Sequence, residues 1–326
     1  MKYKKFMILA IISLICFVFF SFFGHGGYYF IADDIDHMIF WQYHLPMLLA
    51  SLLVGGALAM AGAILQTLLK NPLADASILG ISSGSQFVGL LLVLLLSSMH
   101  VNSSGFIDFY LASILGAAAV LVLFLIVLLS FKQINNIAII ILLGVGISAI
   151  FSAATALMMS FLSSDLLQRM VLWQFGGFSS ISWQQDGFMA AMLIVFLLFG
   201  HKNAKAFDLF ALGETEAELM GLNVKALFIT LCCFLAPLIA ATVAIAGPIG
   251  FIGLVSPHIA RWWLKSNKMQ ELIWASLIIG ALMLMSAQFI AINILYPQII
   301  AVGIITSIIG APFLIYLVIN ALGRKQ

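Results

Sequence analysis

Long runs without Asp, Glu, Lys or Arg dominate the chain. A membrane-spanning helix needs ~20 consecutive apolar residues, and most of these runs reach or exceed that length. The last run is too long for one span, and the turn-forming residues between Asn293 and Gln298 divide it into two helices. The runs are residues 6–32, 37–69, 76–107, 109–131, 133–164, 187–201, 226–260 and 272–323.

This pattern predicts an all-α, polytopic membrane protein with about ten traverses. All of the 14 Lys and Arg residues except Arg169 fall on one side of the predicted trace. The positive-inside rule makes that side cytoplasmic and places both termini there. The predicted traverses are residues 6–30, 44–69, 79–98, 109–131, 137–161, 187–201, 226–246, a short broken one at 250–263, 271–294 and 302–322.

Composition supports the same class. Apolar residues make up 64% of the 326 residues and charged ones only 8%, which excludes a water-soluble protein. The net charge of +2 is too small to indicate nucleic acid. Because no loop is long enough for a soluble domain, we predict a single transmembrane domain over residues 1–326. A cleaved signal peptide is the alternative for the first run, although Gly24 to Gly27 lack the usual cleavage pattern.

Two distant segments share a spacing. Residues 57–74 place Ala61-Gly62 ten residues before Pro72, and residues 242–260 place Ala246-Gly247 ten residues before Pro257. The charge trace runs the two segments in opposite directions, which is typical of the inverted repeats of transporters. We therefore predict repeat halves of about 44–161 and 226–322. Chance similarity in a chain rich in Gly and Ala is the alternative.

Glycines and prolines between residues 247 and 258 argue against one regular helix there. Irregular backbone at membrane depth is tolerated only when it is buried in protein or lines a watery cavity. This segment is therefore the best candidate for a pathway or a hinge. For His258 the alternative is a structural histidine that is hydrogen-bonded within the protein. The candidate pathway or hinge residues are Gln66, Asn71, Pro72, Gly247, Pro248, Gly250, Pro257 and His258.

No catalytic or metal-binding pattern is present in the sequence. Cys16, Cys232 and Cys233 lie in apolar runs without metal-ligand spacing, so we predict neither a metal nor a cofactor. Carriers driven by protons or sodium usually have buried acids within their spans, and this chain shows none. The sequence therefore predicts that the chain is not an enzyme and that another chain supplies the energy.

The motifs NPLADASILGISSG at 71–84 and GPIGFIGLVSPHIAR at 247–261 resemble the FecCD family of binding-protein-dependent ABC importer permeases. Further matching segments lie at 56–75, 211–222 and 302–317. The resemblance implies ten spans in each subunit of a dimer in the cytoplasmic membrane of a bacterium. It also implies a cytoplasmic ATPase dimer, an extracytoplasmic solute-binding protein and a second permease subunit as partners.

Within this resemblance, residues 211–222 match the cytoplasmic segment that such permeases press into a groove of the ATPase, and we expect the whole coupling segment to span about 207–225. Gly221, with Asn223 two residues later, is a residue pattern that favours the end of a short helix. A solvated acidic loop helix is the alternative. The candidate coupling residues are Leu212, Gly213, Glu214, Glu216, Ala217 and Gly221.

The resemblance also implies an inner gate in the turn between the fourth and fifth spans. The matching stretch is Gln133 to Ala138, which makes Asn135 and Asn136 the candidate gate residues. Asparagine can hydrogen-bond across a two-fold axis, but an ordinary polar turn is an equal alternative.

The sequence departs from the family at its outer surface. Family members usually carry Arg-x-Pro-Arg where this chain has His44-Leu45-Pro46-Met47, and expected charged residues are replaced by Gln288, Ile292 and Ile299. The binding protein is therefore expected to dock through hydrogen bonds at His44, Tyr296 and Gln298. Alternatively, a different second permease supplies the arginines, which would make the dimer a heterodimer.

The leading functional prediction is the membrane subunit of an importer for a metal chelate, with a ferric siderophore as the first candidate. Haem, cobalamin or an oxyanion are alternatives within the same family. A self-sufficient carrier or channel is a second class of function, and a membrane scaffold without transport is a third.

Overall fold

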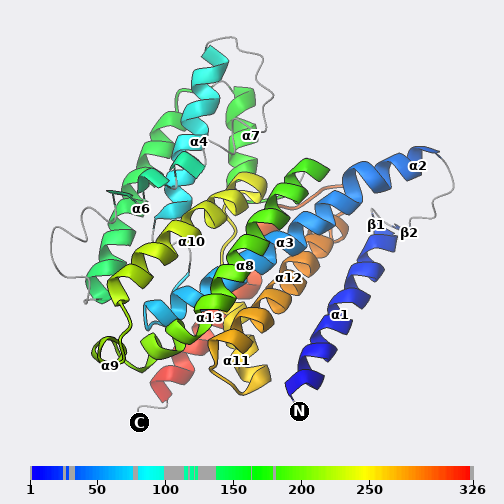
Figure 1. The fold of residues 1–326 in the computed structure, drawn as a ribbon. Coiled ribbons are helices and arrows are strands. Elements are labelled where there is room, and N and C mark those ends of the chain that lie inside the picture. The colour runs from blue at the N-terminus through cyan, green and yellow to red at the C-terminus, as the bar shows by residue number, and fades with distance from the viewer. Residues whose placement is uncertain are drawn as a thin grey trace.

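The computed structural model describes residues 2–24, 27–28, 34–75, 80–98, 114–116, 118–120, 122–123, 137–162, 164–178 and 181–323. Figure 1 shows a bundle of helices, with one pair of two-residue strands among the described residues. Its elements are α1 (Lys2–Phe22), β1 (Phe23–Gly24), β2 (Gly27–Tyr28), α2 (Asp34–Ile39), the π-helix η1 (Phe40–His44), α3 (Leu45–Leu68), α4 (Ile81–Ser98), α6 (Ile137–Met159), α7 (Ser164–Gln174), α8 (Trp183–Leu212), α9 (Glu214–Leu219), α10 (Val224–Ala246), α11 (Ile252–Leu264), α12 (Met269–Asn293) and α13 (Val302–Gly323).

Helix α3 lies at the centre of the bundle and packs against α8, α10, α11 and α12. Its small residues let neighbouring backbones come close, as expected for helix association in lipid. A Cβ on Gly55 would overlap the carbonyl oxygen of Gly280 in α12, and one on Gly62 would overlap the carbonyl oxygen of Gly253 in α11. The stripe of small residues thus sets the distance from α3 to two of its neighbours.

Six helical segments are long and apolar enough to cross a membrane: Lys4–Phe22, Asp34–Leu68, Leu142–Met159, Trp183–Leu212, Val224–Ala246 and Met269–Asn293. Two shorter apolar helices are Ile81–Leu92 and Val302–Leu317. Apart from the short pair β1 and β2, the regular elements of the described residues are helices, which confirms the all-α fold class. The expected count of ten stays a prediction, because the traverse at 109–131 lies mostly outside them.

The first two traverses differ from their expected bounds. α1 ends at Phe22 instead of residue 30, and the chain then pairs Gly24 with Gly27 across β1 and β2. Glycine weakens a helix, which explains the early end. The second traverse begins at Asp34 instead of residue 44, and it passes through η1. Pro46 has no N–H to donate to residue 42, so the preceding turn widens and Leu45 donates to Phe40.

Helix α8 is longer than the charge-free run at 187–201 that predicted it. It begins with a capping box formed by Ser182 and Gln185 and ends at Leu212. Its second half carries Lys202, Lys205 and Asp208 beyond the apolar stretch. A run defined by the absence of charge stops before Lys202, although the helix itself continues to Leu212. The helix α7 was not among the predicted elements either.

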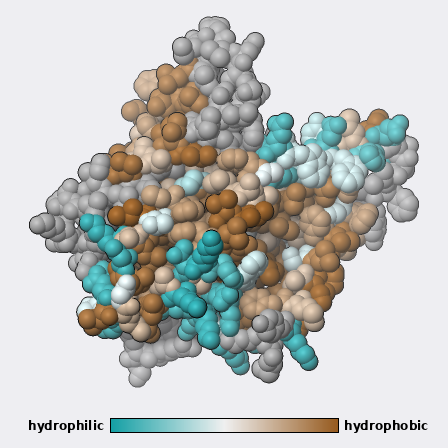
Figure 2. Space-filling model, in the orientation of Figure 1, coloured by the Kyte–Doolittle hydropathy of each residue, from teal (hydrophilic) through white to brown (hydrophobic). Residues whose placement is uncertain are grey.

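Hydrophilic residues gather toward the two ends of the bundle in this view (Figure 2). Figure 1 shows the first and last described residues at the lower end of the view, together with α9 and α11. Figure 2 shows apolar side chains over the flank formed by α8, α10 and α12, with hydrophilic ones gathered toward the lower end and at the upper right, near α2. The flank therefore has the surface of a protein that faces lipid.

Candidate functional site: the α3–α11 crossing and the α9 segment

The break before α11 is shorter than the sequence indicated. Regular helix resumes at Ile252, so Gly253, Pro257 and His258 lie inside α11, and the expected irregular stretch of 247–258 shrinks to 247–251. Gly247 and Phe251 both have a φ of 69°, in the left-handed region, at the two ends of the break. Gly250 lies between them, and no other atom would contact a Cβ there.

Helix α11 tolerates Pro257 because Gln66 of α3 compensates for the missing donor. Proline has no N–H, so in a regular helix the carbonyl oxygen of Gly253 loses its partner. The Nε2 of Gln66 lies 3.3 Å from that oxygen and 3.2 Å from the carbonyl oxygen of Leu254, and donates to both. Gln66 is only 3% exposed, so its amide serves α11 and does not face open space.

Arg261 completes this contact and was not among the candidate residues. Its Nη1 donates to the Oε1 of Gln66 at 2.7 Å. A hydrogen bond from a charged donor is stronger than one between neutral groups. The sequence contained one signal for this role, because Arg261 follows Pro257 by one helical turn inside the GPIGFIGLVSPHIAR motif.

His258 is hydrogen-bonded within the protein, as in the structural alternative given for it in the sequence analysis. Its Nδ1 lies 2.9 Å from the carbonyl oxygen of Leu254, one turn earlier in α11. Its ring meets Phe313 of α13 edge to face, with the centroids 6.2 Å apart. The side chain therefore links α11 to α13.

Protein packs around the start of the break. The N–H of Gly177 donates to the carbonyl oxygen of Ala246 at 2.9 Å. A Cβ on Gly247 would overlap the carbonyl oxygen of Trp173, and one on Gly303 would overlap that of Phe175. Irregular backbone inside a membrane protein is tolerated where protein buries it or where it lines a watery cavity. At Gly247 the backbone is buried in protein.

The end of α3 turns toward α8. Lys70 has a φ of 43°, and the Oδ1 of Asn71 accepts a hydrogen bond from the N–H of Leu73 at 2.9 Å. This side-chain turn around Pro72 ends the helix. The ammonium group of Lys70 lies 5.3 Å from the ring centroid of Phe210, near the end of α8. Asn71 and Pro72 therefore lie beside the segment that leads into α9.

Two glycines delimit α9. Gly213 has a φ of 155° and Gly221 a φ of 86°, both in the range that favours glycine. At the second, Gly221 N–H donates to Glu218 and Leu222 N–H to Ala217, which is the Schellman arrangement. The side chain of Asn223 then caps α10 by accepting from Ala226 N–H. The geometry thus gives a short, separately capped helix between two long ones.

The surface of α9 combines exposed apolar side chains with acids. Leu212, Leu219 and Met220 are 67%, 84% and 63% exposed, whereas Ala217 is fully buried against the bundle. Burial raises the pKa of Glu214, the charge of Glu218 raises it further, and Lys70 opposes the shift. Exposed leucine and methionine next to carboxylates are a surface suited to a protein partner.

Comparison with known proteins decides the family. The model of the FecCD transport family matches residues 5–320. The chain belongs to this family.

Among relatives of this FecCD chain are an iron(3+)-hydroxamate import permease, FhuG, of Bacillus subtilis (32% identical, 92% of this chain, 87% of the relative) and a vitamin B12 import permease, BtuC, of Klebsiella pneumoniae (36%, 88% and 84%). A haemin transport permease, HmuU, of Yersinia pestis is 32% identical, over 89% of this chain and 85% of the relative. A chain solved in an inward-facing conformation of a metal-chelate type ABC transporter superposes with a TM-score of 0.86 at 27% identity, over 97% of this chain and 99% of that one.

One candidate docking residue of this FecCD chain is buried. His44 is 2% exposed, and its Nε2 lies 3.0 Å from the carbonyl oxygen of Phe20, so it links η1 to α1 inside the protein. Its burial leaves no surface for a binding protein. Gln288 and Ile292 are also buried, whereas Tyr296 and Gln298 are exposed in the turn between α12 and α13. The candidate gate residues, Asn135 and Asn136, lie outside the described residues.

Proposed function

We propose that this FecCD chain is the permease subunit of an ATP-driven importer, and that its cargo is a metal chelate with a ferric siderophore as the first candidate. The relatives include importers for iron hydroxamate, ferric citrate and haemin, which supports an iron chelate. Vitamin B12 permeases at similar identity make cobalamin the main alternative, with haem and an oxyanion behind it.

The observation that carries the proposal is the form of α9. A permease without its own ATPase needs a protruding element that a partner protein can bind and move. Glu214–Leu219 is capped separately from α8 and α10, and it presents Leu219 and Met220 to the outside. We assign Leu212, Gly213, Glu214, Glu216, Ala217 and Gly221 to coupling with a cytoplasmic ATPase dimer.

This assignment fixes the proposed topology. If α9 faces the cytoplasm, the described chain ends at the same end of the bundle are cytoplasmic too, in agreement with the distribution of lysine and arginine. We propose one membrane domain over residues 1–326 in the bacterial cytoplasmic membrane. Its two repeat halves, about 44–161 and 226–322, would meet where Gly62 touches Gly253.

Tyr296 and Gln298 remain the proposed contacts for an extracytoplasmic solute-binding protein. Both are exposed at the opposite end of α12 from Met269, which supports this placement. A second permease with its own outer arginines would make the importer a heterodimer. Co-expression with candidate permeases, followed by purification through a tag on this chain, distinguishes the two assemblies.

We further propose that Asn135 and Asn136 form an inner gate between two permease subunits. Subunits that carry Asn136→Cys should form a disulfide across the dimer axis and lose transport. Restoration of uptake by a reductant is the control. If no cross-link forms in any nucleotide state, the residues do not form a gate.

Reconstitution tests the function directly. Vesicles that contain the full complex, with ATPase and binding protein, should take up an iron chelate only with ATP inside. A panel of ferric hydroxamate, ferric citrate, haemin and vitamin B12 then identifies the cargo. Vesicles that contain this chain alone should show no flux, and flux there would instead support a self-sufficient carrier or channel.

Two substitutions test the role of α9. Gly221→Arg places a side chain at a φ that disfavours it, and Glu216→Lys reverses a charge on the exposed surface. Both should leave the protein inserted but abolish ATP-dependent uptake and binding of the ATPase. Lys202→Glu, an exposed charge reversal on α8, is the matched control and should leave uptake near normal.

A further inference from the structure

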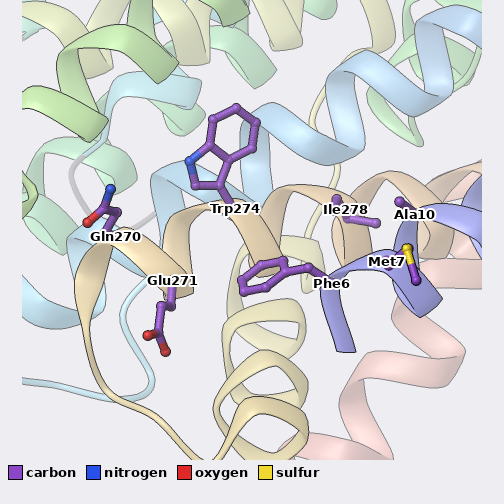
Figure 3. Close-up of a pocket in the computed structure, with 7 residues that line it drawn as sticks. All are labelled: Phe6, Met7, Ala10, Gln270, Glu271, Trp274 and Ile278. Atoms are coloured by element: carbon purple, nitrogen blue, oxygen red, sulfur yellow. The ribbon is translucent and has the colours of Figure 1, made fainter. Parts of the chain in front are cut away.

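A cavity of about 590 Å³ opens between the first halves of α1 and α12. Phe6, Met7 and Ala10 of α1 and Trp274 and Ile278 of α12 form its apolar wall. Gln270 and Glu271 lie at one end (Figure 3). We call this the α1–α12 pocket; its volume lies within the ~300–1,000 Å³ typical of small-molecule sites.

The pocket has the polarity of a membrane leaflet. From Gln270 to Ile278 is eight residues of helix, or about 12 Å. Its polar end lies at the start of both helices, and its apolar end lies deeper in the lipid-facing flank. The Nε1 of Trp274 lies 3.4 Å from the Nδ1 of His201, so the indole sits between polar and apolar surroundings, as tryptophan does at membrane interfaces.

Four lysines lie on the segments that border the polar end of the pocket. Lys4 is exposed next to the lining residues of α1, and the ammonium of Lys5 donates to the carbonyl oxygen of Trp263 at 2.6 Å. That bond places the end of α11, and Lys265 after it, beside α1. Lys268 immediately precedes α12. Two acids lie in the same region. Glu271 lines the pocket, and the carboxylate of Asp208 accepts a hydrogen bond from Met269 N–H at 2.8 Å. The four lysines therefore outnumber these acids.

We propose that the α1–α12 pocket binds an anionic phospholipid, with an acyl chain against Phe6, Trp274 and Ile278 and the phosphate among Lys4, Lys5 and Lys268. Basic pockets between membrane helices on the cytoplasmic side attract anionic head groups, and an apolar cavity open to lipid takes up hydrocarbon. Lys5 retains two ammonium hydrogens beyond the one bound to Trp263.

Quenching of Trp274 fluorescence by brominated acyl chains tests the proposal. The full chain is reconstituted in phosphatidylcholine vesicles that contain increasing amounts of brominated phosphatidylglycerol or brominated phosphatidylethanolamine. The difference between the wild type and Trp274→Phe isolates the signal of Trp274 from the other five tryptophans. Half-maximal quenching should need on the order of tenfold less phosphatidylglycerol than phosphatidylethanolamine.

Two pairs of variants separate the pocket from bulk lipid. Ala10→Phe fills the cavity and should weaken the quenching, whereas Ile11→Phe, on the exposed part of α1 outside the pocket, should leave it unchanged. Lys4→Gln with Lys268→Gln should remove the head-group preference, and Lys225→Gln on α10 should not. Equal quenching by both lipids, or an Ala10→Phe curve that matches the wild type, would overturn the proposal.

Discussion

The bond between Gln66 and Arg261 makes a quantitative prediction about the α3–α11 contact. Gln66→Met keeps the length of the side chain but removes its donor and its acceptor. Arg261→Met removes the charged partner while it keeps part of the apolar stem. A double-mutant cycle with both changes isolates the energy of their interaction from the separate cost of each substitution.

The magnitude follows from the geometry. A hydrogen bond to a charged group contributes about 1.5–3 kcal/mol, and the 2.7 Å distance from Nη1 to Oε1 places this bond among the strong ones. The two longer bonds from Nε2 to the carbonyl oxygens of Gly253 and Leu254 add about 1 kcal/mol together. Gln66→Met should therefore cost about 2.5–4 kcal/mol in all, and the coupling with Arg261→Met should be about 1.5–3 kcal/mol.

Reversible unfolding in mixed micelles of dodecyl maltoside and dodecyl sulfate measures the free energy of unfolding of each variant. Gln298→Met, at an exposed glutamine, is the control and should change that free energy by less than about 0.5 kcal/mol. A coupling energy below about 0.5 kcal/mol would show that the two side chains act independently, and would refute the bond between Gln66 and Arg261 as a stabilising link from α3 to α11.

Three further results are expected. Gly62→Ala should lower the free energy of unfolding by about 1–3 kcal/mol because its Cβ meets Gly253, whereas Gly146→Ala, where nothing lies within 4 Å, should not lower it. Gly221→Ala, at a φ of 86°, should speed amide exchange in α9 by destabilising its end, as mass spectrometry would detect. Because the folded pKa of Glu214 is raised, α9 should be most protected below the usual carboxyl pKa and lose protection as the pH rises, a trend that Glu214→Gln should abolish.

The apolar runs predicted the helices well where the ends of a run coincide with the ends of a helix. α12 and α13 begin and end within about two residues of their predicted bounds, because Asn293 to Gln298 form a turn that no helix crosses. The length of α8 was underestimated because the ends of its apolar run do not coincide with the ends of the helix. Its capped start at Ser182 and its charged second half lie outside the apolar run, yet both belong to the same helix.

The widened turn before α3 could not be predicted from the sequence, for a different reason. Pro46 is normally a sign of a helix start, and the sequence placed the second traverse just ahead of it. The chain instead enters from Asp34 and absorbs the missing N–H in the turn from Phe40 to His44. The same turn buries His44 against α1, which no local pattern could indicate.

The role of Pro257 shows why the candidate hinge was drawn too long. Proline breaks a helix when its freed carbonyl finds no partner, and the local sequence offers none. Gln66, which supplies the partner, lies almost 190 residues earlier in the chain. α11 can therefore stay regular only while it remains against α3. A movement of α11 alone would leave the carbonyl oxygen of Gly253 and the guanidinium of Arg261 without this partner inside the bundle. The two helices should consequently move together, and bending should concentrate between Gly247 and Phe251, where no such bond from Gln66 restrains the backbone.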